Sequence, residues 1–200
     1  MYSARTGHLP PTPTCVAFAD AFARGAHILE VGCGSGRDAA YFLSKGLVVT
    51  AFDGSTAMVE QARARTEGLV SCTTWDMTQH HWPWQGQMDG IWASASLLHL
   101  PRAEMFPVWQ SMQKALSPEG PGRVCITLKQ GQGEGYDAEG RFFTYYDPAQ
   151  LLELAQRSGL FATCEVRAST LDQLGRANTE WLELHGMMFP LALQNAPGYG

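Results

Sequence analysis

Short apolar runs alternate along the chain with segments in which apolar residues have helical spacing. The runs lie at His27–Val31, Leu47–Phe52, Leu69–Thr74, Gly90–Ser94 and Arg123–Leu128. Short apolar strands that alternate with helices are typical of a parallel sheet covered on both faces. We therefore predict an α/β fold with a doubly wound, mostly parallel sheet. Two further runs, Phe161–Arg167 and Glu180–Met188, have no helical pattern between them, which predicts an antiparallel C-terminal hairpin at the sheet edge.

Capping signals delimit the helices between these strands. Gly46 occupies the position where a left-handed residue ends a helix, and Ser55 is suited to cap the helix that follows it. Asp147 and Pro148 form a cap and first-turn pair, which opens a helix that ends near Gly159. The predicted helices cover Cys15–Arg24, Arg37–Lys45, about 55–66, Arg102–Leu116 and about 148–159.

Length and composition narrow the class of protein. The 200 residues suffice for one substantial core, so we expect a single domain over residues 1–200. The chain has neither an apolar stretch of membrane-spanning length nor a signal-peptide pattern, so we expect a soluble protein with no membrane partner. Five scattered cysteines without zinc spacing favour reduced thiols in the cytoplasm. The net charge of −5 disfavours a nucleic-acid partner.

The stretch "ILEVGCGSGRDAAYFLSKG" places three glycines between the first predicted strand and a helix. Around Gly32, Gly34 and Gly36 the backbone N–H groups can approach a ligand that a Cβ would repel. Arg37 stands where the dinucleotide fingerprint has its third glycine, which argues against NAD. Taken alone, the turn is equally compatible with a tight strand–helix connection.

Two acidic residues extend this interpretation. Asp53 ends the second strand about 20 residues beyond the first glycine, where a carboxylate can accept hydrogen bonds from both hydroxyls of a ribose. Asp76 follows the third strand and suits the exocyclic amino group of adenine, although alone it is equally well a turn-forming residue. Together the glycine turn and the two acids indicate a nucleoside.

Residues 26–130 resemble the class I S-adenosylmethionine-dependent methyltransferases, and a looser resemblance continues to the end of the chain. "LEVGCGSGRD" is similar to the first motif of that family, "TTWDM" to its adenine-side pair, and "DGIWASASLLHLP" to its fourth-strand motif. "ALSPEGPGRVCITLK" resembles the family's "LKPGG" turn but departs from it at Glu119 and Pro121. Within the family, the chain is most similar to small bacterial enzymes labelled tellurite-resistance-like.

The resemblance implies a Rossmann-like methyltransferase fold with S-adenosylmethionine as the cofactor. We predict as cofactor-binding residues Glu30, Gly32, Cys33, Gly34, Arg37, Asp53, Gly54, Ser55, Asp76, Met77, Ala93 and Ser94. For Arg37 the alternative is a solvated helix residue, and Cys33 needs no reactive role. The adjacent His80 and His81 point apart in any regular structure, so we expect structural packing there and no metal site.

We predict methyl transfer to a small-molecule acceptor. The alternatives are a non-catalytic S-adenosylmethionine-binding partner or sensor, and a methyltransferase that acts on RNA or protein. His99 follows the fourth strand and is the candidate catalytic base for an acceptor proton. The alternative, which we favour for this residue, is a histidine that fixes the loop or contacts the carboxylate of the cofactor.

The glycine-rich residues 129–147 follow the fifth strand, and we interpret them as a flexible gate over the acceptor. Arg141 is the expected contact to an anionic or polar acceptor, because a guanidinium can clamp an oxyanion with two hydrogen bonds. The alternative is an exposed loop whose aromatic residues only pack onto the core. The predicted substrate-binding residues are Lys129, Tyr136, Arg141, Phe143, Tyr145 and Tyr146.

Overall fold

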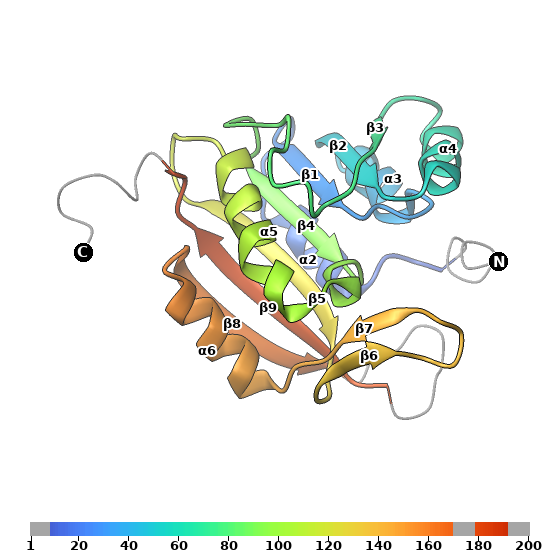
Figure 1. Cartoon of the computed structure of the whole chain (residues 1–200). Coiled ribbons are helices and arrows are strands. Elements are labelled where there is room, and N and C mark those ends of the chain that lie inside the picture. Colours follow the sequence, from blue (N-terminus) through green and yellow to red (C-terminus); the bar gives the residue numbers. More distant parts are fainter. Residues whose placement is uncertain (1–8, 170–178, 192–200) are drawn as a thin grey trace.

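The computed structural model describes residues 9–169 and 179–191. Residues 1–8, where the sequence lacks a signal-peptide pattern, and the connection 170–178, where it lacks a helical pattern, lie outside the described residues. The described chain forms a twisted seven-stranded sheet between two layers of helices, with a small separate two-stranded sheet (Figure 1). None of the described helices combines the length and apolar character that crossing a membrane requires.

The main sheet has the strand order β3-β2-β1-β4-β5-β9-β8. The first five strands pair in parallel, and β9 is antiparallel to both of its neighbours. The strand order therefore reverses between β1 and β4, which is where sheets of this type bind ligands, beyond the carboxyl ends of the strands. The strands are β1 (His27–Val31), β2 (Val48–Asp53), β3 (Ser71–Thr74), β4 (Gly90–Ser94), β5 (Gly122–Lys129), β8 (Phe161–Ser169) and β9 (Trp181–Met188).

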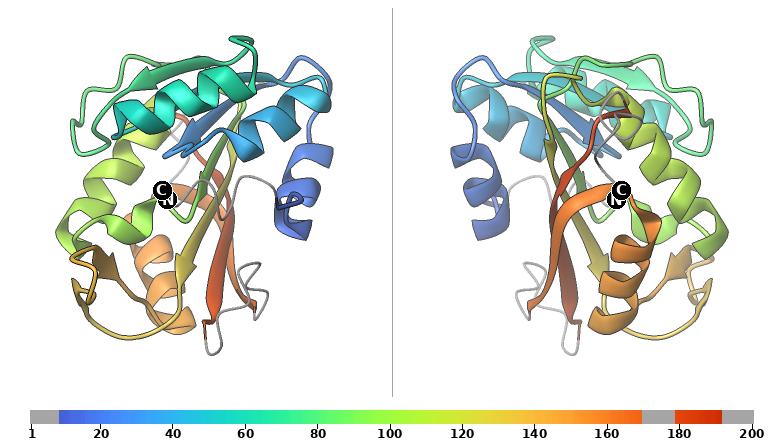
Figure 2. Two further views of the ribbon diagram at one scale, coloured as in Figure 1. Left: turned by 90° about the vertical axis from the view of Figure 1, so that its right-hand side faces the viewer. Right: turned by 90° about the vertical axis from the view of Figure 1, so that its left-hand side faces the viewer.

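The helices divide between the two faces of the sheet. Helices α2, α3 and α4 cover one face, and α5 and α6 cover the other (Figure 2). The doubly wound, mostly parallel sheet predicted from the sequence is confirmed. The helices are α2 (Pro13–Asp20), α3 (Arg37–Ser44), α4 (Thr56–Arg65), α5 (Arg102–Ala115) and α6 (Pro148–Ser158), with a 3-10 turn η1 (Leu97–His99) after β4.

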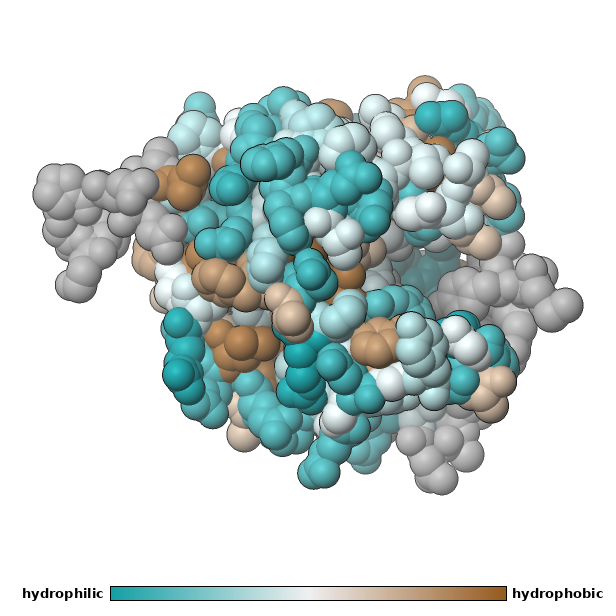
Figure 3. Space-filling view, viewed as in Figure 1, coloured by the Kyte–Doolittle hydropathy of each residue, from teal (hydrophilic) through white to brown (hydrophobic). Residues whose placement is uncertain are grey.

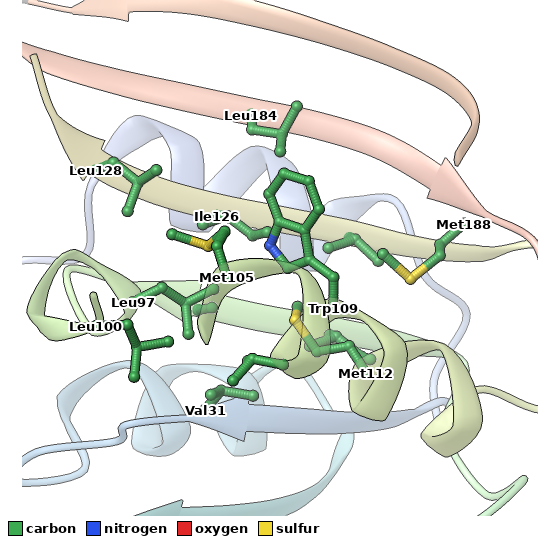
Figure 4. Packing of buried hydrophobic residues seen from close by; sticks show 14 of the residues in the cluster. Val31, Leu97, Leu100, Met105, Trp109, Met112, Ile126, Leu128, Leu184 and Met188 are labelled. Carbon is green, nitrogen blue, oxygen red and sulfur yellow. The ribbon is translucent and has the colours of Figure 1, made fainter. Parts of the chain in front are cut away.

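Each face of the sheet has its own hydrophobic core, because successive side chains of a strand point to opposite faces. Ile28 of β1 packs with α2 and α3, whereas its neighbour Leu29 packs with α5. On the α5 face, the fully buried Trp109 is surrounded by side chains of the central strands and of β9 (Figure 4). These two cores fix the carboxyl ends of β1, β2, β4 and β5 side by side.

The C-terminal hairpin is confirmed as antiparallel, but the strand that is last in sequence lies inside the sheet. Strand β9 pairs with β5 on one side and β8 on the other, so β8 forms the edge. Burial explains this order: Leu182, Leu184 and Met188 of β9 are fully buried, while most residues of β8 alternate between exposed and half-buried positions.

Several element boundaries differ from the predicted ones. The first helix spans α2 and not Cys15–Arg24, because the Thr12 side chain accepts a hydrogen bond from the Cys15 N–H and Pro13 follows as the first helical residue. This is the same signal that correctly predicted Asp147 as the cap of α6. Residues 129–147 are not an irregular loop, since they contain an antiparallel hairpin of β6 (Glu134–Tyr136) and β7 (Phe142–Thr144).

Candidate functional site

The three glycines after β1 have different reasons for lacking a side chain. All three have positive φ angles. A Cβ on Gly32 would lie 2.3 Å from the Cβ of Ser96, and a Cβ on Gly36 would lie 2.8 Å from the Cα of Ala62 in α4. A Cβ on Gly34 would meet no protein atom within 4 Å. Two of the glycines therefore allow parts of the protein to pack closely, and only the middle one borders open space.

Asp53 closes the glycine loop from the end of β2. Its Oδ2 accepts a hydrogen bond from the Gly34 N–H at 2.8 Å, and its Oδ1 accepts one from the Ser55 N–H at 2.9 Å. Ser55 is the N-cap residue of α4, as predicted, although its side chain makes no capping hydrogen bond. Gly54 between them has open space around its Cβ position. Asp53 thus fixes the glycine loop and the start of α4 and keeps unused acceptor sites on both oxygens.

The turn after β4 packs against the glycine loop. Ala95 has a left-handed φ of 51°, which costs a residue with a side chain about 1–3 kcal/mol, and its N–H donates to the Thr127 Oγ1 at 2.9 Å. Ser94 Oγ lies 3.3 Å from the same hydroxyl. Next to them, the Ser96 Oγ is buried with no hydrogen-bond partner among the described residues. The structure therefore holds a strained turn with an unsatisfied hydroxyl directly beside Gly32.

A buried polar cluster lies under the glycine loop on the α3 face. Asp38 accepts hydrogen bonds from the Arg37 Nε at 2.7 Å and from the Trp92 Nε1 at 3.0 Å. The carboxyl group of Glu30 at the end of β1 is buried, and its Oε2 has no partner among the described residues. Burial, together with the charge of Asp38, raises the pKa of Glu30 well above its usual range.

The other predicted cofactor residues occupy diverse positions. Asp76 is exposed and accepts two hydrogen bonds from Thr78, so it forms the turn that the sequence left open as an alternative. It is tied to the site through Trp75, whose N–H donates to the Asp53 carbonyl at 3.0 Å. Met77 packs against the α5-side core, and Ala93 is fully buried there. Cys33 is buried, and a hydrogen bond with the Cys72 thiol together with burial strongly raises its pKa.

The β6–β7 hairpin is anchored to the segment that follows β4. His99 Nδ1 lies 2.8 Å from the Phe142 carbonyl oxygen, and the Thr144 hydroxyl donates to the Leu100 carbonyl. The Arg102 N–H donates to Glu134 at 2.8 Å, and the Arg102 guanidinium donates to the Tyr145 carbonyl. In the space-filling view the surface is hollowed between this hairpin and the loops that follow β1, β2 and β3 (Figure 3). The hairpin therefore forms one wall of a hollow whose opposite wall carries the glycine loop.

Three nitrogen-bearing side chains converge on the Phe143 ring. Lys129 Nζ lies 3.8 Å from its centroid, Arg141 Cζ lies 5.3 Å away, and the centroid of the His99 ring lies 4.7 Å away. Partial burial and the two cations lower the pKa of His99, although the Phe142 carbonyl opposes that shift. The imidazole is therefore mostly neutral at pH 7.

The remaining predicted gate residues do not form one surface. Tyr136 is 77% exposed, and Tyr146 is buried beneath the Arg102 guanidinium. Tyr145 stacks loosely on Phe143, with a centroid distance of 6.1 Å. Arg141 pairs with Asp137 at 2.7 Å and Glu139 at 3.0 Å across the hairpin turn, so its guanidinium already has carboxylate partners.

Sequence reasoning missed Ala95, Ser96 and Thr127. A small-residue run after an apolar strand, "ASAS", was a signal for a tight turn, but nothing local marks Thr127 as its partner. The close pairing of β4 with β5 brings these residues together. Of the three residues, Ser96 packs against the glycine loop, at Gly32.

Comparison of the sequence with known proteins shows which family it matches. Residues 28–120 match the protein family described as "Methyltransferase domain". Methyltransferase GfsG of Streptomyces halstedii is 35% identical over an alignment of 112 residues, and the match covers 54% of this chain and 40% of that protein. The chain thus spans less than half of the length of this curated relative.

Solved structures share the fold at low sequence identity. The 1,6-didemethyltoxoflavin-N1-methyltransferase of Burkholderia thailandensis, bound to 1,6-didemethyltoxoflavin and S-adenosylhomocysteine, superimposes with a TM-score of 0.74 and 19% identity over 94% of this chain and 80% of its own. A TehB-like SAM-dependent methyltransferase from Corynebacterium glutamicum gives 0.69 and 20%, over 94% and 92%. Residues 28–120 therefore form a methyltransferase domain, and the chain has the fold of the class I S-adenosylmethionine-dependent methyltransferases.

Proposed function

We propose that this protein binds S-adenosylmethionine (SAM) at the glycine loop and transfers its methyl group to a small molecule held against the β6–β7 hairpin. The observation that carries the proposal is the open space at Gly34, bordered by Asp53 and lying at the carboxyl end of β1, where the strand order reverses. The match to a methyltransferase domain supports the same assignment.

The residues around this space fit the chemical parts of the cofactor. Asp53 has acceptor capacity on both oxygens for the two ribose hydroxyls. Glu30 Oε2 and Ser96 Oγ have no hydrogen-bond partner among the described residues and are available to the methionine end of the cofactor. Ser96 lies next to the glycine loop because Gly32 has no side chain. Asp76 and Met77 follow β3, on the adenine side, and Arg37 is the cation for the carboxylate. When bound, SAM supplies a methyl group on a positively charged sulfur for direct displacement by a nucleophile.

The chain contributes to this chemistry mainly by holding the acceptor in line and by excluding water. Positioning of this kind is worth up to about 7–11 kcal/mol of the barrier in favourable cases. The hairpin is anchored at its base by His99, Leu100 and Arg102, so it supplies a wall at a fixed place, while its glycine-containing turn is exposed. Lys129, which lies over the buried Phe143 ring, gives this wall a cationic group for the acceptor.

His99 is suited to accept a proton from the acceptor. The Phe142 carbonyl can only accept a hydrogen bond, so the Nδ1 of His99 carries the proton. In the neutral ring Nε2 is then the unprotonated nitrogen. The lowered pKa keeps this nitrogen available at neutral pH.

Calorimetric titration and a transfer assay test the proposal. We expect SAM and S-adenosylhomocysteine (SAH) to bind and NAD not to bind, because the glycine spacing and Asp53 suit a nucleoside that carries no pyrophosphate. We also expect SAH to accumulate when the protein and SAM are incubated with a panel of small amines, phenols and thiols. Binding of NAD without binding of SAM contradicts the cofactor assignment. Binding of SAM without transfer to any member of the panel contradicts the proposed acceptor class.

A further inference from the structure

A row of polar residues crosses the sheet on the face that α2 covers. Ser94 of β4 lies opposite Thr127 of β5, and Thr127 lies opposite Glu183 of β9. Residues directly opposite each other in neighbouring strands point to the same face of the sheet. With about 5 Å between neighbouring strands, the backbone at Glu183 lies roughly 10 Å from that at Ser94. The row thus runs from the end of β4, next to the turn that packs on the glycine loop, to the Glu183 carboxylate on β9.

Two neighbours hold the Glu183 carboxylate in place. The Thr14 hydroxyl in the first turn of α2 donates to Oε1 at 2.6 Å, and the His185 Nε2 lies 3.2 Å from Oε2. The side chains of Glu183 and His185 are 18% and 24% exposed, so both remain partly open to solvent. These hydrogen bonds lower the pKa of Glu183 and keep it ionised at pH 7. Each oxygen uses one acceptor site and retains another.

Two arginines near this row pair with carboxylates other than Glu183. Arg37 pairs with Asp38, and Arg167, which lies opposite Glu183 on β8, pairs with Glu165 at 2.5 Å. Within residues 9–169 and 179–191, no lysine or arginine lies within ion-pair distance of Glu183. Because each oxygen of Glu183 retains an acceptor site, a bound ammonium group can donate a charge-assisted hydrogen bond to it.

We propose that Glu183 selects the methyl acceptor by receiving its amino group, and that Thr14 and His185 position the carboxylate. This inference rests on the proposed function and names its substrate class as a small primary or secondary amine. The bound ammonium group first loses one proton to solvent, which frees the nitrogen lone pair while Glu183 stays ionised. The lone pair then forms the N–CH3 bond while the S–CH3 bond breaks, and the electron pair of that bond stays on sulfur, which becomes a thioether. The methylated product leaves as an ammonium ion.

A binding experiment on the complex with SAH tests the charge selection without requiring the natural acceptor. The probes are benzylamine, which is protonated at neutral pH, and benzyl alcohol, which has a similar shape and no charge. We expect the wild-type complex to bind benzylamine at least ten-fold more tightly than benzyl alcohol in calorimetric titrations. Glu183→Gln preserves the size of the side chain and removes its charge, so the two probes should then bind within two-fold of each other.

Two further variants separate selection from general effects. Glu165→Gln removes a carboxylate from the same face of β8, and it should keep the wild-type preference for the amine. Thr14→Val leaves the charge of Glu183 but frees its Oε1, so benzylamine should bind more weakly while benzyl alcohol and SAH bind as in wild type. If Glu183→Gln does not fold, the wild-type preference and a change of the His185 ring 15N shifts on adding benzylamine decide the question.

The outcomes distinguish this inference from the proposed function. A protein that does not bind SAH contradicts the proposed function, and this inference falls with it. A protein that binds SAH but shows no preference for benzylamine, or keeps that preference in Glu183→Gln, contradicts this inference alone.

Discussion

Replacing Gly34 with alanine separates the cost of a backbone conformation from the loss of a binding space. Gly34 has a φ of 53° and Gly68, between α4 and β3, has one of 74°, and neither has a protein atom within 4 Å of its Cβ position. A left-handed alanine costs about 1–2 kcal/mol, so each variant should lose a similar amount of unfolding free energy. For a chain of this length, that loss lowers Tm by about 2–8 °C.

The two variants should differ in cofactor binding. The methyl group of Gly34→Ala projects into the space that we assign to the cofactor, so we expect its Kd for SAH to rise at least about 100-fold, or nearly 3 kcal/mol. Gly68→Ala lies away from the glycine loop, so its Kd should stay within two-fold of wild type. Thermal unfolding and calorimetric titration of both variants give the comparison. Equal SAH affinity in the two variants would refute the assignment of the space at Gly34.

Four other outcomes follow from the described contacts. Asp53→Ala should raise the Kd for SAH by about 5- to 150-fold in calorimetry, which is the 1–3 kcal/mol cost of unmaking hydrogen bonds to a partly buried acceptor; an unchanged Kd contradicts the ribose role. Arg141→Ala should change the KM or kcat of an accepted substrate while SAH binds within a few-fold of wild type, and loss of SAH binding would exclude a gate role. Trp109→Ala should cost about 3–5 kcal/mol in chemical denaturation, because its ring fills the α5-side core; a smaller loss means that the core collapses around the gap. The pKa of His99 lies below its ordinary 6.5, so the unfolded state binds more protons and the unfolding free energy falls as pH drops from 7 through the folded pKa. His99→Gln should remove that part of the pH slope, and an unchanged slope contradicts the desolvation of the ring.

Local patterns in the sequence were sufficient for the order and type of most elements. Apolar runs marked β1, β2, β4 and β5, and the Asp147–Pro148 pair marked the start of α6 as the structure has it. These signals are local because a cap or a buried strand depends on residues that are neighbours in the chain. The same type of signal at Thr12 and Pro13 was present but not used, which placed the first helix too late.

The tertiary structure decided which residues meet. Gly32 needs no side chain because Ser96 packs on it, and Gly36 because α4 passes it, so only Gly34 borders open space. Nothing in the sequence distinguishes these three positions, since their neighbours are contributed by the turn after β4 and by α4.

The same holds for Glu183, which the sequence presents as one polar residue in a short strand. It joins Thr127 and Thr14 only because β9 inserts between β5 and β8. That insertion depends on the burial of Leu182, Leu184 and Met188, and their burial depends on packing against elements that are distant in the sequence. The sequence by itself therefore determined the sheet, the glycine turn and the acids that follow it, and only the tertiary structure decided which polar groups face the site, because contacts between distant strands are set by packing and not by spacing along the chain.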